Sequence, residues 1–299
     1  MKIVEISGSS GFVGQNLVNY LTGMYQIKTV SLRYIPNQKI KIEGNAFIHL
    51  AGKAHDLKKV STPQDYYDAN YELVKQVFDA FVESNAKIFI LISSVKAVAD
   101  EVEGALTESI IPNPATHYGK SKLMAEEYLL SKKYPDNKKV YILRPCMIHG
   151  EGNKGNLNLL FSIVQRGIPY PLGSYSNQRS LLSIENLCFV IKELIVSSEM
   201  PSTIYNVADD KPLSTNRMIE LMAEGLSKKP SIWCVNKKVI DFIARLGDVL
   251  QLPFNSERLQ KLTENYIVDN SKIKAELNIN LPVTSEEGLL NTIQHFIGK

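Results

Sequence analysis

The sequence has few cysteines, little net charge and no long apolar run, and each of these absences excludes a class of protein. Its three cysteines, Cys146, Cys188 and Cys234, lie far apart without a CxxC pair, which excludes a disulfide framework and a zinc site and fits a reducing cytoplasm. A formal net charge of +3, without a block of like charges, indicates no nucleic-acid partner. No apolar run reaches the roughly 18 residues of a membrane helix, and the N-terminus runs directly into a strand-like stretch, so we expect neither membrane span nor signal peptide.

The composition is that of an ordinary globular protein. Hydrophobic residues make up 44% of the 299 residues and charged residues 22%. A chain of this length is long enough for one large α/β core and a smaller second lobe.

Short apolar runs alternate with helical patterns through the first half of the chain. The runs typical of β-strands are Ile3–Ser7, Lys28–Leu32, Ala46–Leu50, Lys87–Ser93 and Lys139–Leu143. The helical patterns between them cover Gly11–Thr22, Asp65–Glu83 and Tyr118–Lys133. Strands that are apolar throughout and separated by helices predict a parallel sheet covered on both faces, which is the doubly wound Rossmann arrangement of an α/β protein.

The pattern changes after Pro145, and we expect a second, mostly helical lobe there. Gly, Asn and Pro gather between residues 150 and 177, around one helical pattern at Leu157–Arg166. We therefore predict a dinucleotide domain over residues 1–150 and a substrate lobe over 151–299, interleaved because the strand Thr203–Val207 rejoins the first domain. The apolar residues of Asp241–Leu252 have helical spacing, and we expect them to pack in the core and not to form a partner surface.

A glycine-rich loop follows the first predicted strand. Gly8, Gly11 and Gly14 have GxxGxxG spacing between a strand and a helix, where glycines allow a tight turn and close approach of backbone N–H groups to a pyrophosphate. The alternative is a plain strand-to-helix turn. The cofactor contacts predicted in this loop are Gly8, Ser10, Gly11, Phe12, Val13 and Gly14.

The second predicted strand ends without the acidic residue that often holds the ribose 2′-hydroxyl of NAD. The stretch from Val30 to Tyr34 contains neither Asp nor Glu, and Arg33 stands there instead. A guanidinium at this place suits a 2′-phosphate, which slightly favours NADP over NAD. The alternative is that Arg33 is an exposed charge.

A YxxxK pattern carries the predicted chemistry. Tyr118 and Lys122 lie one turn apart on one helix face. A tyrosine hydroxyl titrates near pH ~10, and a nearby ammonium with a positively charged nicotinamide ring lowers that pKa enough for proton exchange with a sugar oxygen. Three further pairs match the pattern by chance, and only Tyr118 follows Lys87–Ser93 at the start of the next helix; these pairs are Tyr71/Lys75, Tyr128/Lys132 and Tyr134/Lys138.

Ser94 directly follows the predicted strand Lys87–Ser93, at the sheet edge where ligands bind in such folds. A hydroxyl there can orient the reacting oxygen toward Tyr118. The alternative is a strand-end serine that satisfies local backbone.

Taken together, these motifs resemble the extended short-chain dehydrogenase/reductases of the nucleotide-sugar epimerase/dehydratase family. The resemblance spans nearly the whole chain and rests on GSSGFVG (8–14), IHLAG (48–52), Asn70, ISS (92–94), YGKSK (118–122), LRP (143–145), HGEGNKGNLNLL (149–160), GIPYPLG (167–173), RSLLSIENL (179–187) and VDNSK (268–272). It implies that Ser94, Tyr118 and Lys122 are catalytic. It also implies cofactor contacts at Leu50, Ala51, Gly52, Pro145, Tyr118 and Lys122, and substrate contacts at Ser94, Lys96, Asn156 and Arg179.

Two departures from the family pattern narrow the activity. Sugar 4,6-dehydratases of this family usually carry an Asp-Glu pair after the catalytic hydroxyl, where this sequence has Val95 and Lys96, so dehydration is disfavoured. The segment from Tyr34 to Asn45 is short and offers no clear acidic contact for adenine. His55 and His117 are interpreted as polar loop residues, with a substrate contact by His55 as the alternative.

Two activities remain by this resemblance, and both move a hydride at sugar C4 of a nucleotide sugar. The segments SSVKAV (93–98) and GNKGNLNLL (152–160) look most like a branch of the family that acts on UDP-linked, N-acetylated amino sugars for surface polysaccharide synthesis. One of the two activities is 4-epimerisation with retained NAD, and the other is reduction of a 4-keto sugar by NADPH, which Arg33 favours. A non-catalytic NADP-sensing regulator on the same fold is the alternative from another class. The resemblance further implies a homodimer through Asp65–Glu83 and Tyr118–Lys133. We expect no metal and no membrane partner.

Overall fold

The computed structural model describes residues 1–53, 62–153, 155–197, 200–252 and 254–298, without the side chain of Asn156. A six-stranded sheet in the order β2-β1-β3-β4-β6-β9 forms its centre, and every neighbouring pair in it is parallel. Its strands are β1 (Ile3–Ser7), β2 (Gln26–Val30), β3 (Ala46–His49), β4 (Ile88–Ile92), β6 (Lys139–Pro145) and β9 (Thr203–Val207). The predicted doubly wound parallel sheet is confirmed.

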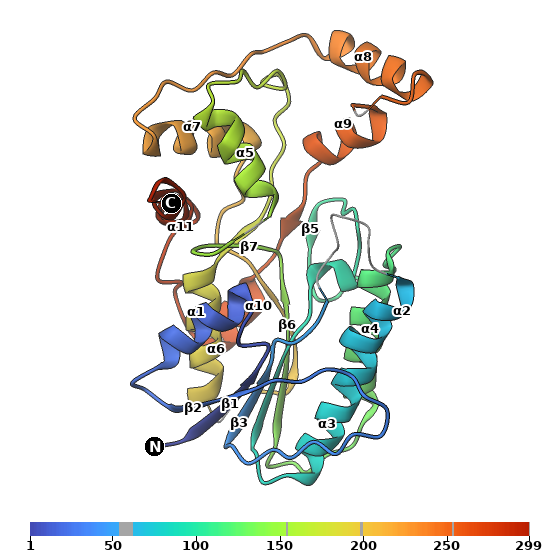
Figure 1. Cartoon of the computed structure of the whole chain (residues 1–299), viewed down its shortest axis with the longest axis vertical. Helices are drawn as coiled ribbons and strands as arrows, with labels where there is room; N and C mark the ends of the chain where they lie inside the picture. Colours follow the sequence, from blue (N-terminus) through green and yellow to red (C-terminus); the bar gives the residue numbers. More distant parts are fainter. Residues whose placement is uncertain (54–61, 154, 198–199, 253, 299) are drawn as a thin grey trace.

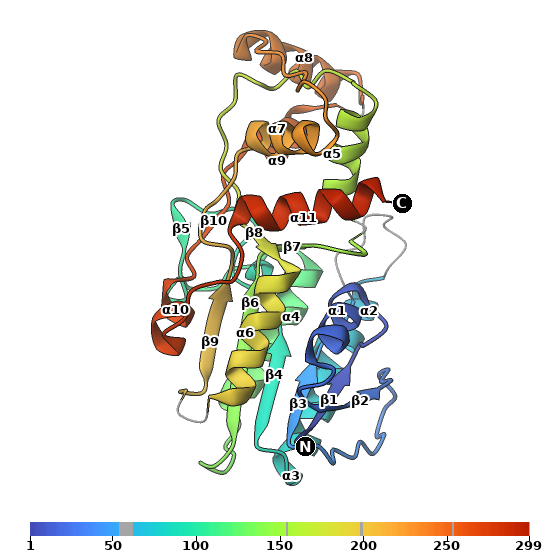
Figure 2. The same cartoon turned by 90° about the vertical axis from the view of Figure 1, so that its left-hand side faces the viewer.

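Helices cover both faces of this sheet (Figures 1 and 2). On one face lie α2 (Pro63–Tyr67), the π-helical segment η1 (Asp68–Glu72), α3 (Leu73–Glu83) and α4 (His117–Ser131). On the other face lie α1 (Phe12–Leu21), α6 (Ile184–Val196) and α10 (Ser271–Leu277). The single helix predicted over Asp65–Glu83 is interrupted by η1, and the dimer predicted through α3 and α4 stays a prediction.

The second predicted strand is displaced by two residues. It forms as Gln26–Val30, because the backbone pairs in register with Ile3–Ser7 of β1, and not as Lys28–Leu32. This strand lies at the sheet edge and is largely exposed, so burial does not impose an apolar pattern that the sequence could reveal.

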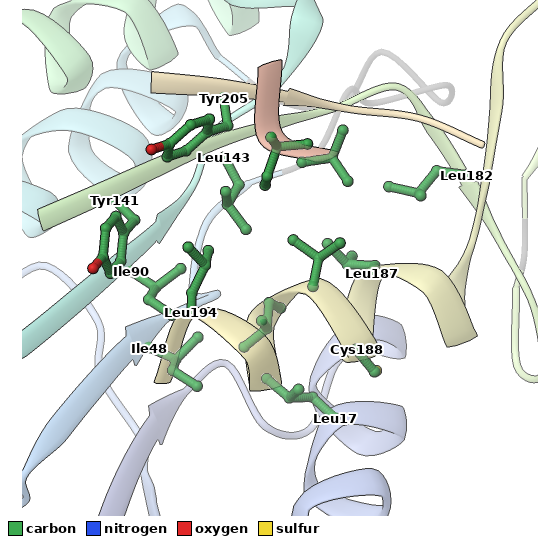
Figure 3. Packing of buried hydrophobic residues seen from close by; sticks show 14 of the residues in the cluster. Leu17, Ile48, Ile90, Tyr141, Leu143, Leu182, Leu187, Cys188, Leu194 and Tyr205 are labelled. Carbon is green, nitrogen blue, oxygen red and sulfur yellow. The ribbon is translucent and has the colours of Figure 1, made fainter. Parts of the chain in front are cut away.

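Helix α6 provides much of the core on its face of the sheet. Leu187 and Leu194 point from α6 toward Ile48, Ile90 and Leu143 of three neighbouring strands (Figure 3). All five side chains are fully buried. The rigid sheet therefore holds its strand ends, and the residues that follow them, in fixed positions.

A smaller, mostly helical lobe lies beyond the carboxyl ends of the strands (Figures 1 and 2). It contains α5 (Asn156–Gln165), α7 (Thr215–Gly225), α8 (Lys237–Val249), α9 (Ser256–Thr263) and α11 (Ser285–Ile297). Two short parallel pairs link it to the sheet: β7 (Met147–His149) with β8 (Leu181–Ser183), and β5 (Ala105–Leu106) with β10 (Ile267–Val268). The 3₁₀ segment η2 (Val95–Ala97) follows β4. The division at residue 150 stays a prediction.

The expectation for residues 241–252 is wrong. Ala244 and Gly247 of α8 are buried, but Phe242 is 68% and Val249 79% exposed. The helix has apolar residues on two faces, and only one of these faces meets another element. All three cysteines are free, and no helix in the described ranges is long and apolar enough to cross a bilayer.

Candidate active site

The candidate site lies where β1, β3 and β4 end side by side. Ser7, His49 and Leu91 stand opposite one another in the sheet register, so the segments that follow all emerge at one edge. These segments are the glycine loop, the Leu50–Lys53 segment and the turn that contains Ser94. In a doubly wound sheet, ligands bind at this edge.

The glycine loop is closed by contacts that exclude side chains at two of its glycines. Gly8 has φ +71°, and a Cβ atom there would lie 2.6 Å from the amide nitrogen of Ala51. A Cβ on Gly14 would lie 2.3 Å from the carbonyl oxygen of Gly8. At Gly11 the nearest protein atom would be an ordinary 3.4 Å away, so the protein leaves that position open. Helix α1 begins at Phe12, and its first N–H groups suit the phosphates of a dinucleotide.

The other predicted cofactor residues lie within this loop or in the segments that follow β3 and end β6. Phe12 is half-buried beside Gly150 and Gly152, and Ser10 is exposed. Pro145 is buried as the last residue of β6, opposite Val207 of β9. Val13, Leu50 and Ala51 are half-buried, while Gly52 is exposed.

Tyr118 is the second residue of α4 and lies against the end of β4. Its side chain forms a hydrogen bond with Ser94 and an edge-to-face ring contact with Tyr66, with ring centroids 6.3 Å apart. Burial raises the pKa of Tyr118, and the Ser94 hydrogen bond opposes this by favouring the phenolate. The described residues on their own therefore keep the phenol neutral, and further positive charge is needed to acidify it.

Lys122 lies one turn after Tyr118 and is buried. Its Nζ donates a hydrogen bond to the carbonyl oxygen of Ile92, 3.0 Å away, and a Cβ on Gly52 would lie 3.4 Å from it. Burial lowers the pKa of Lys122 to about 8, although Glu126 opposes the shift. The ammonium is thus held under the loop after β3, on the same helix face as the phenol.

Asn70 connects the Leu50–Lys53 segment to α4 through hydrogen bonds. The Asn70 Oδ1 accepts from the Lys53 amide at 2.8 Å, and the Nδ2 donates to the Lys53 carbonyl and to Ser121 Oγ at 3.0 and 3.1 Å. Asn70 is fully buried within η1, and single π turns inside helices are frequent at functional sites. The local departure from α-helix directs this amide at the Gly52–Lys53 backbone.

His49 is a buried polar residue near Lys122 that is absent from the predicted site. His49 ends β3, and its Nδ1 shares a 2.9 Å hydrogen bond with Ser7 Oγ. Burial, with the charge of Lys122, lowers the pKa of His49 to about 3, so this imidazole is neutral. The sequence signal was a histidine inside the otherwise apolar run Ala46–Leu50.

A buried ion pair supports the same helix face. The single Nε–H of Arg144 is shared by both carboxylate oxygens of Glu126, at 3.1 and 3.0 Å, and Arg144 Nη2 donates to one of them as well. Glu126 also accepts a hydrogen bond from Ser93 Oγ. Both charged side chains are almost fully buried. Tyr118, Lys122 and Glu126 recur every four residues, and this period is the signal that could have identified the third member.

Arg179 and Lys96 lie together next to Tyr266. Arg179 Nη2 donates to the Lys261 carbonyl and lies 3.3 Å from Glu264 Oε1, while Arg179 Nε is buried and has no partner among the described residues. Lys96 Nζ donates to the Asp100 carbonyl at 2.8 Å and sits 4.2 Å above the Tyr266 ring. Burial lowers the pKa of Lys96; the charges of Asp100 and Glu264 oppose this shift, and the charge of Arg179 adds to it.

The remaining predicted residues fall outside this cluster. Arg33 is exposed beyond the end of β2, and its guanidinium makes no hydrogen bond or ion pair with the described residues. His117 is the first residue of α4, hydrogen-bonded to Tyr67 at 3.1 Å, and not a loop residue. Asn156 begins α5, but its side chain, like all of His55, lies outside the described part of the chain.

Known proteins share both this sequence pattern and this fold. The model of the NAD dependent epimerase/dehydratase family matches residues 4–208. A UDP-glucose 4-epimerase of Vibrio cholerae is 30% identical over 99% of this chain and 96% of its own. An N-acetyl-alpha-D-glucosaminyl-diphospho-ditrans,octacis-undecaprenol 4-epimerase of Escherichia coli O157:H7 is 26% identical over 98% of this chain and 94% of its own. The solved structure of MoeE5 in complex with UDP-glucuronic acid and NAD has a TM-score of 0.74 at 18% identity, with 99% of each chain covered.

Proposed function

Because this chain belongs to the NAD dependent epimerase/dehydratase family, we propose that it moves a hydride at C4 of a UDP-linked, N-acetylated amino sugar. The observation that carries the proposal is the hydrogen bond between Ser94 and Tyr118, one helical turn before the buried Lys122. A phenol, a hydroxyl and an ammonium gathered at the edge of a dinucleotide fold have the functional groups needed to exchange a proton with an alcohol.

The residues around the glycine loop fit a nicotinamide dinucleotide. A Cβ on Gly11 would meet no protein atom closer than 3.4 Å, so a ligand has room to lie against this glycine. The first N–H groups of α1 provide donors for a pyrophosphate. Tyr118 and Lys122 are near this edge, since Lys122 adjoins Gly52. When bound, the nicotinamide ring takes the C4 hydride of an alcohol or returns it to a ketone.

Tyr118, Lys122 and Ser94 each have a separate role in the proposed proton transfer. As C4 of the sugar is oxidised, the Tyr118 phenolate accepts the proton of the C4 hydroxyl, and in reduction the phenol returns it. The ammonium of Lys122 stabilises the phenolate electrostatically. The hydroxyl of Ser94 donates a hydrogen bond to the reacting oxygen and holds it near Tyr118.

The substrate's diphosphate is proposed to bind at Arg179 and Lys96. The unpartnered Arg179 Nε is a buried donor that a phosphate oxygen would satisfy. Lys96 brings a second positive charge to the same place. Val95, which is buried, and Lys96 offer no acid for loss of water, so the elimination of a dehydratase is not proposed.

We propose 4-epimerisation as the first activity, because the Vibrio cholerae relative, which matches 99% of this chain, is named a UDP-glucose 4-epimerase. Reduction of a 4-keto sugar by NADPH is the second, and the exposed guanidinium of Arg33 favours it. Either activity would supply a sugar for surface polysaccharide.

The exposed apolar face of α8 favours a second substrate class for the same chemistry. This class is a sugar diphosphate carried on a polyprenol, which the name of the Escherichia coli relative states for that protein. The sugar and the diphosphate would occupy the same site, and only the carrier would differ.

Cofactor use separates the two activities. The purified protein is assayed for bound dinucleotide and then incubated with UDP-N-acetylglucosamine or its 4-keto-6-deoxy derivative, with products followed by NMR. Conversion of the first compound without added reductant supports the epimerase, and stoichiometric loss of NADPH with the second supports the reductase. Dinucleotide binding without turnover of either would overturn the proposal of a UDP-linked substrate. Turnover of a polyprenyl-diphosphate-linked N-acetylglucosamine would then favour the second substrate class, and turnover of none of the three compounds would favour a sensor.

A further inference from the structure

Helix α8 has two apolar faces, and the fold covers only one of them. Ile240, Ala244 and Gly247 are buried, and Gly247 faces the chain before α9 so closely that a Cβ would lie 1.9 Å from the Phe254 carbonyl oxygen. Six apolar residues of α8 and its C-cap remain exposed: Val239, Phe242, Ile243, Leu246, Val249 and Leu250. We call these six residues the α8 face.

The α8 face is one continuous stripe. At the α-helical rotation its six residues span an arc of about 120°. The buried residues occupy the neighbouring arc, and Asp241, Arg245 and Asp248 lie on the remaining polar side. Exposed apolar residues scattered singly are ordinary, but a continuous stripe of this size marks a contact surface.

The α8 face also lies at an extremity of the molecule. Figures 1 and 2 show α8 at the end of the long axis opposite the sheet, beyond α5, α7 and α9. A flat surface approaching this end therefore reaches α8 before the rest of the chain.

Positive charge is concentrated in the part of the sequence that contains α8. Residues 228–262 contain seven lysines and arginines against three acidic residues, whereas the whole chain carries only +3. On α8 itself Lys237, Lys238 and Arg245 are exposed, against Asp241 and Asp248. Two copies meeting face to face through α8 would bring these charges together, so a second copy of the chain suits the surface less well than an anionic partner.

We propose that the α8 face docks the enzyme on an anionic lipid bilayer. A helix with a wide apolar stripe and flanking lysines lies in the interface of such a membrane, with the apolar side chains among the acyl chains and the ammonium groups at the lipid phosphates. The absence of a membrane span is compatible with this, because a helix that lies on a bilayer does not cross it. The proposal concerns where the enzyme works and does not depend on which sugar it takes.

Vesicle flotation tests the proposal without any substrate. The full chain is mixed with vesicles of phosphatidylcholine alone or with about a third phosphatidylglycerol, at low and high salt. We expect the protein to float with the anionic vesicles, less with the neutral ones, and less again at high salt. The double variant Phe242→Glu/Val249→Glu should lose about tenfold or more of the binding.

A matched double variant controls for added charge. Ile111→Glu/Val196→Glu changes two side chains that are also well exposed, outside α8 and outside the helices of the predicted dimer, and should bind like the unchanged protein. Melting curves and the molecular mass in solution are measured for all three proteins. Equal flotation of both double variants, no flotation of the unchanged protein, or a dimer that only Phe242→Glu/Val249→Glu dissociates would overturn the proposal, the last in favour of a second copy.

Discussion

Lys122 donates a hydrogen bond from Nζ to the carbonyl oxygen of Ile92, 3.0 Å away and two residues before Ser94 in the chain. One helix side chain is thereby fixed to the strand that leads to the serine, and Ser94 is hydrogen-bonded to Tyr118 on the same helix. The contact links the three side chains of the proposed proton transfer into one unit of fixed geometry. A shift of either element would separate the phenol from its hydroxyl partner.

The Ser94 hydrogen bond should determine part of the pH dependence. It favours the phenolate and lowers the pKa of Tyr118 against the effect of burial, so the rate should rise with pH as Tyr118 ionises. Ser94→Ala removes this effect, and we expect the rising limb to move to higher pH with kcat reduced by about 10²- to 10³-fold. The measurement is kcat against pH for both proteins. Ser93→Ala is the control, because Ser93 donates its hydrogen bond to Glu126 and not to Tyr118. An equal shift of the pH profile in this variant would contradict the role assigned to Ser94.

Two glycines of the loop should respond differently to alanine. A Cβ on Gly14 meets backbone at 2.3 Å, so Gly14→Ala should destabilise the fold itself. Gly11→Ala meets nothing closer than 3.4 Å, so the protein should keep its melting temperature. If the pyrophosphate lies against Gly11, this variant nevertheless binds the dinucleotide at least about tenfold more weakly. Calorimetric titration with NAD and NADPH decides, and undiminished binding would place the phosphates elsewhere.

The buried pair of Glu126 and Arg144 should contribute mainly to the stability of α4. Glu126→Gln leaves the guanidinium buried without a countercharge, and we expect unfolding to become easier by about 3–5 kcal/mol. Glu257→Gln breaks an exposed pair with Lys261 and should cost less than about 1 kcal/mol. Urea unfolding of both variants measures the difference. Similar losses of unfolding free energy in the two variants would show that other groups compensate the buried charge of Arg144.

Arg33 should influence the choice of dinucleotide. Its guanidinium is exposed and makes no hydrogen bond or ion pair with the described residues, so Arg33→Ala should leave the stability of the fold unchanged. If it meets a 2′-phosphate, the affinity for NADPH falls by about tenfold while that for NADH stays the same. Paired titrations with the two reduced cofactors provide the measurement. Parallel changes in both affinities would remove Arg33 from cofactor selection.

The sequence predicted the sheet well because its central strands are apolar on both faces. The central strand β1 and the largely buried edge strand β9 have the predicted bounds, whereas the exposed edge strand β2 does not, since its position depends on pairing with β1. The same strand ends and the spacing of Tyr118 and Lys122 predict that the site residues converge, and the structure brings Ser94, Tyr118 and Lys122 together. Their roles stay predictions.

Other features depend on contacts that no local pattern contains. Arg179 pairs with Glu264, 85 residues further along the chain, and Asn70 reaches across to Ser121. Helical periodicity identified α8 but not its environment, because an apolar stripe has the same spacing whether another element covers it or not. The exposure of Phe242 could therefore be learned only from the assembled fold.

Turnover by Tyr118→Phe tests the central claim most directly. The change removes one hydroxyl, so cofactor affinity and melting temperature should hardly move, while kcat should fall by about 10²- to 10⁴-fold. Tyr128→Phe is the matched control, because Tyr128 is in the same helix and the same YxxxK spacing but hydrogen-bonds Asp79 instead of Ser94. Near-normal turnover of Tyr118→Phe with a well-folded, cofactor-bound protein would contradict the proposed chemistry.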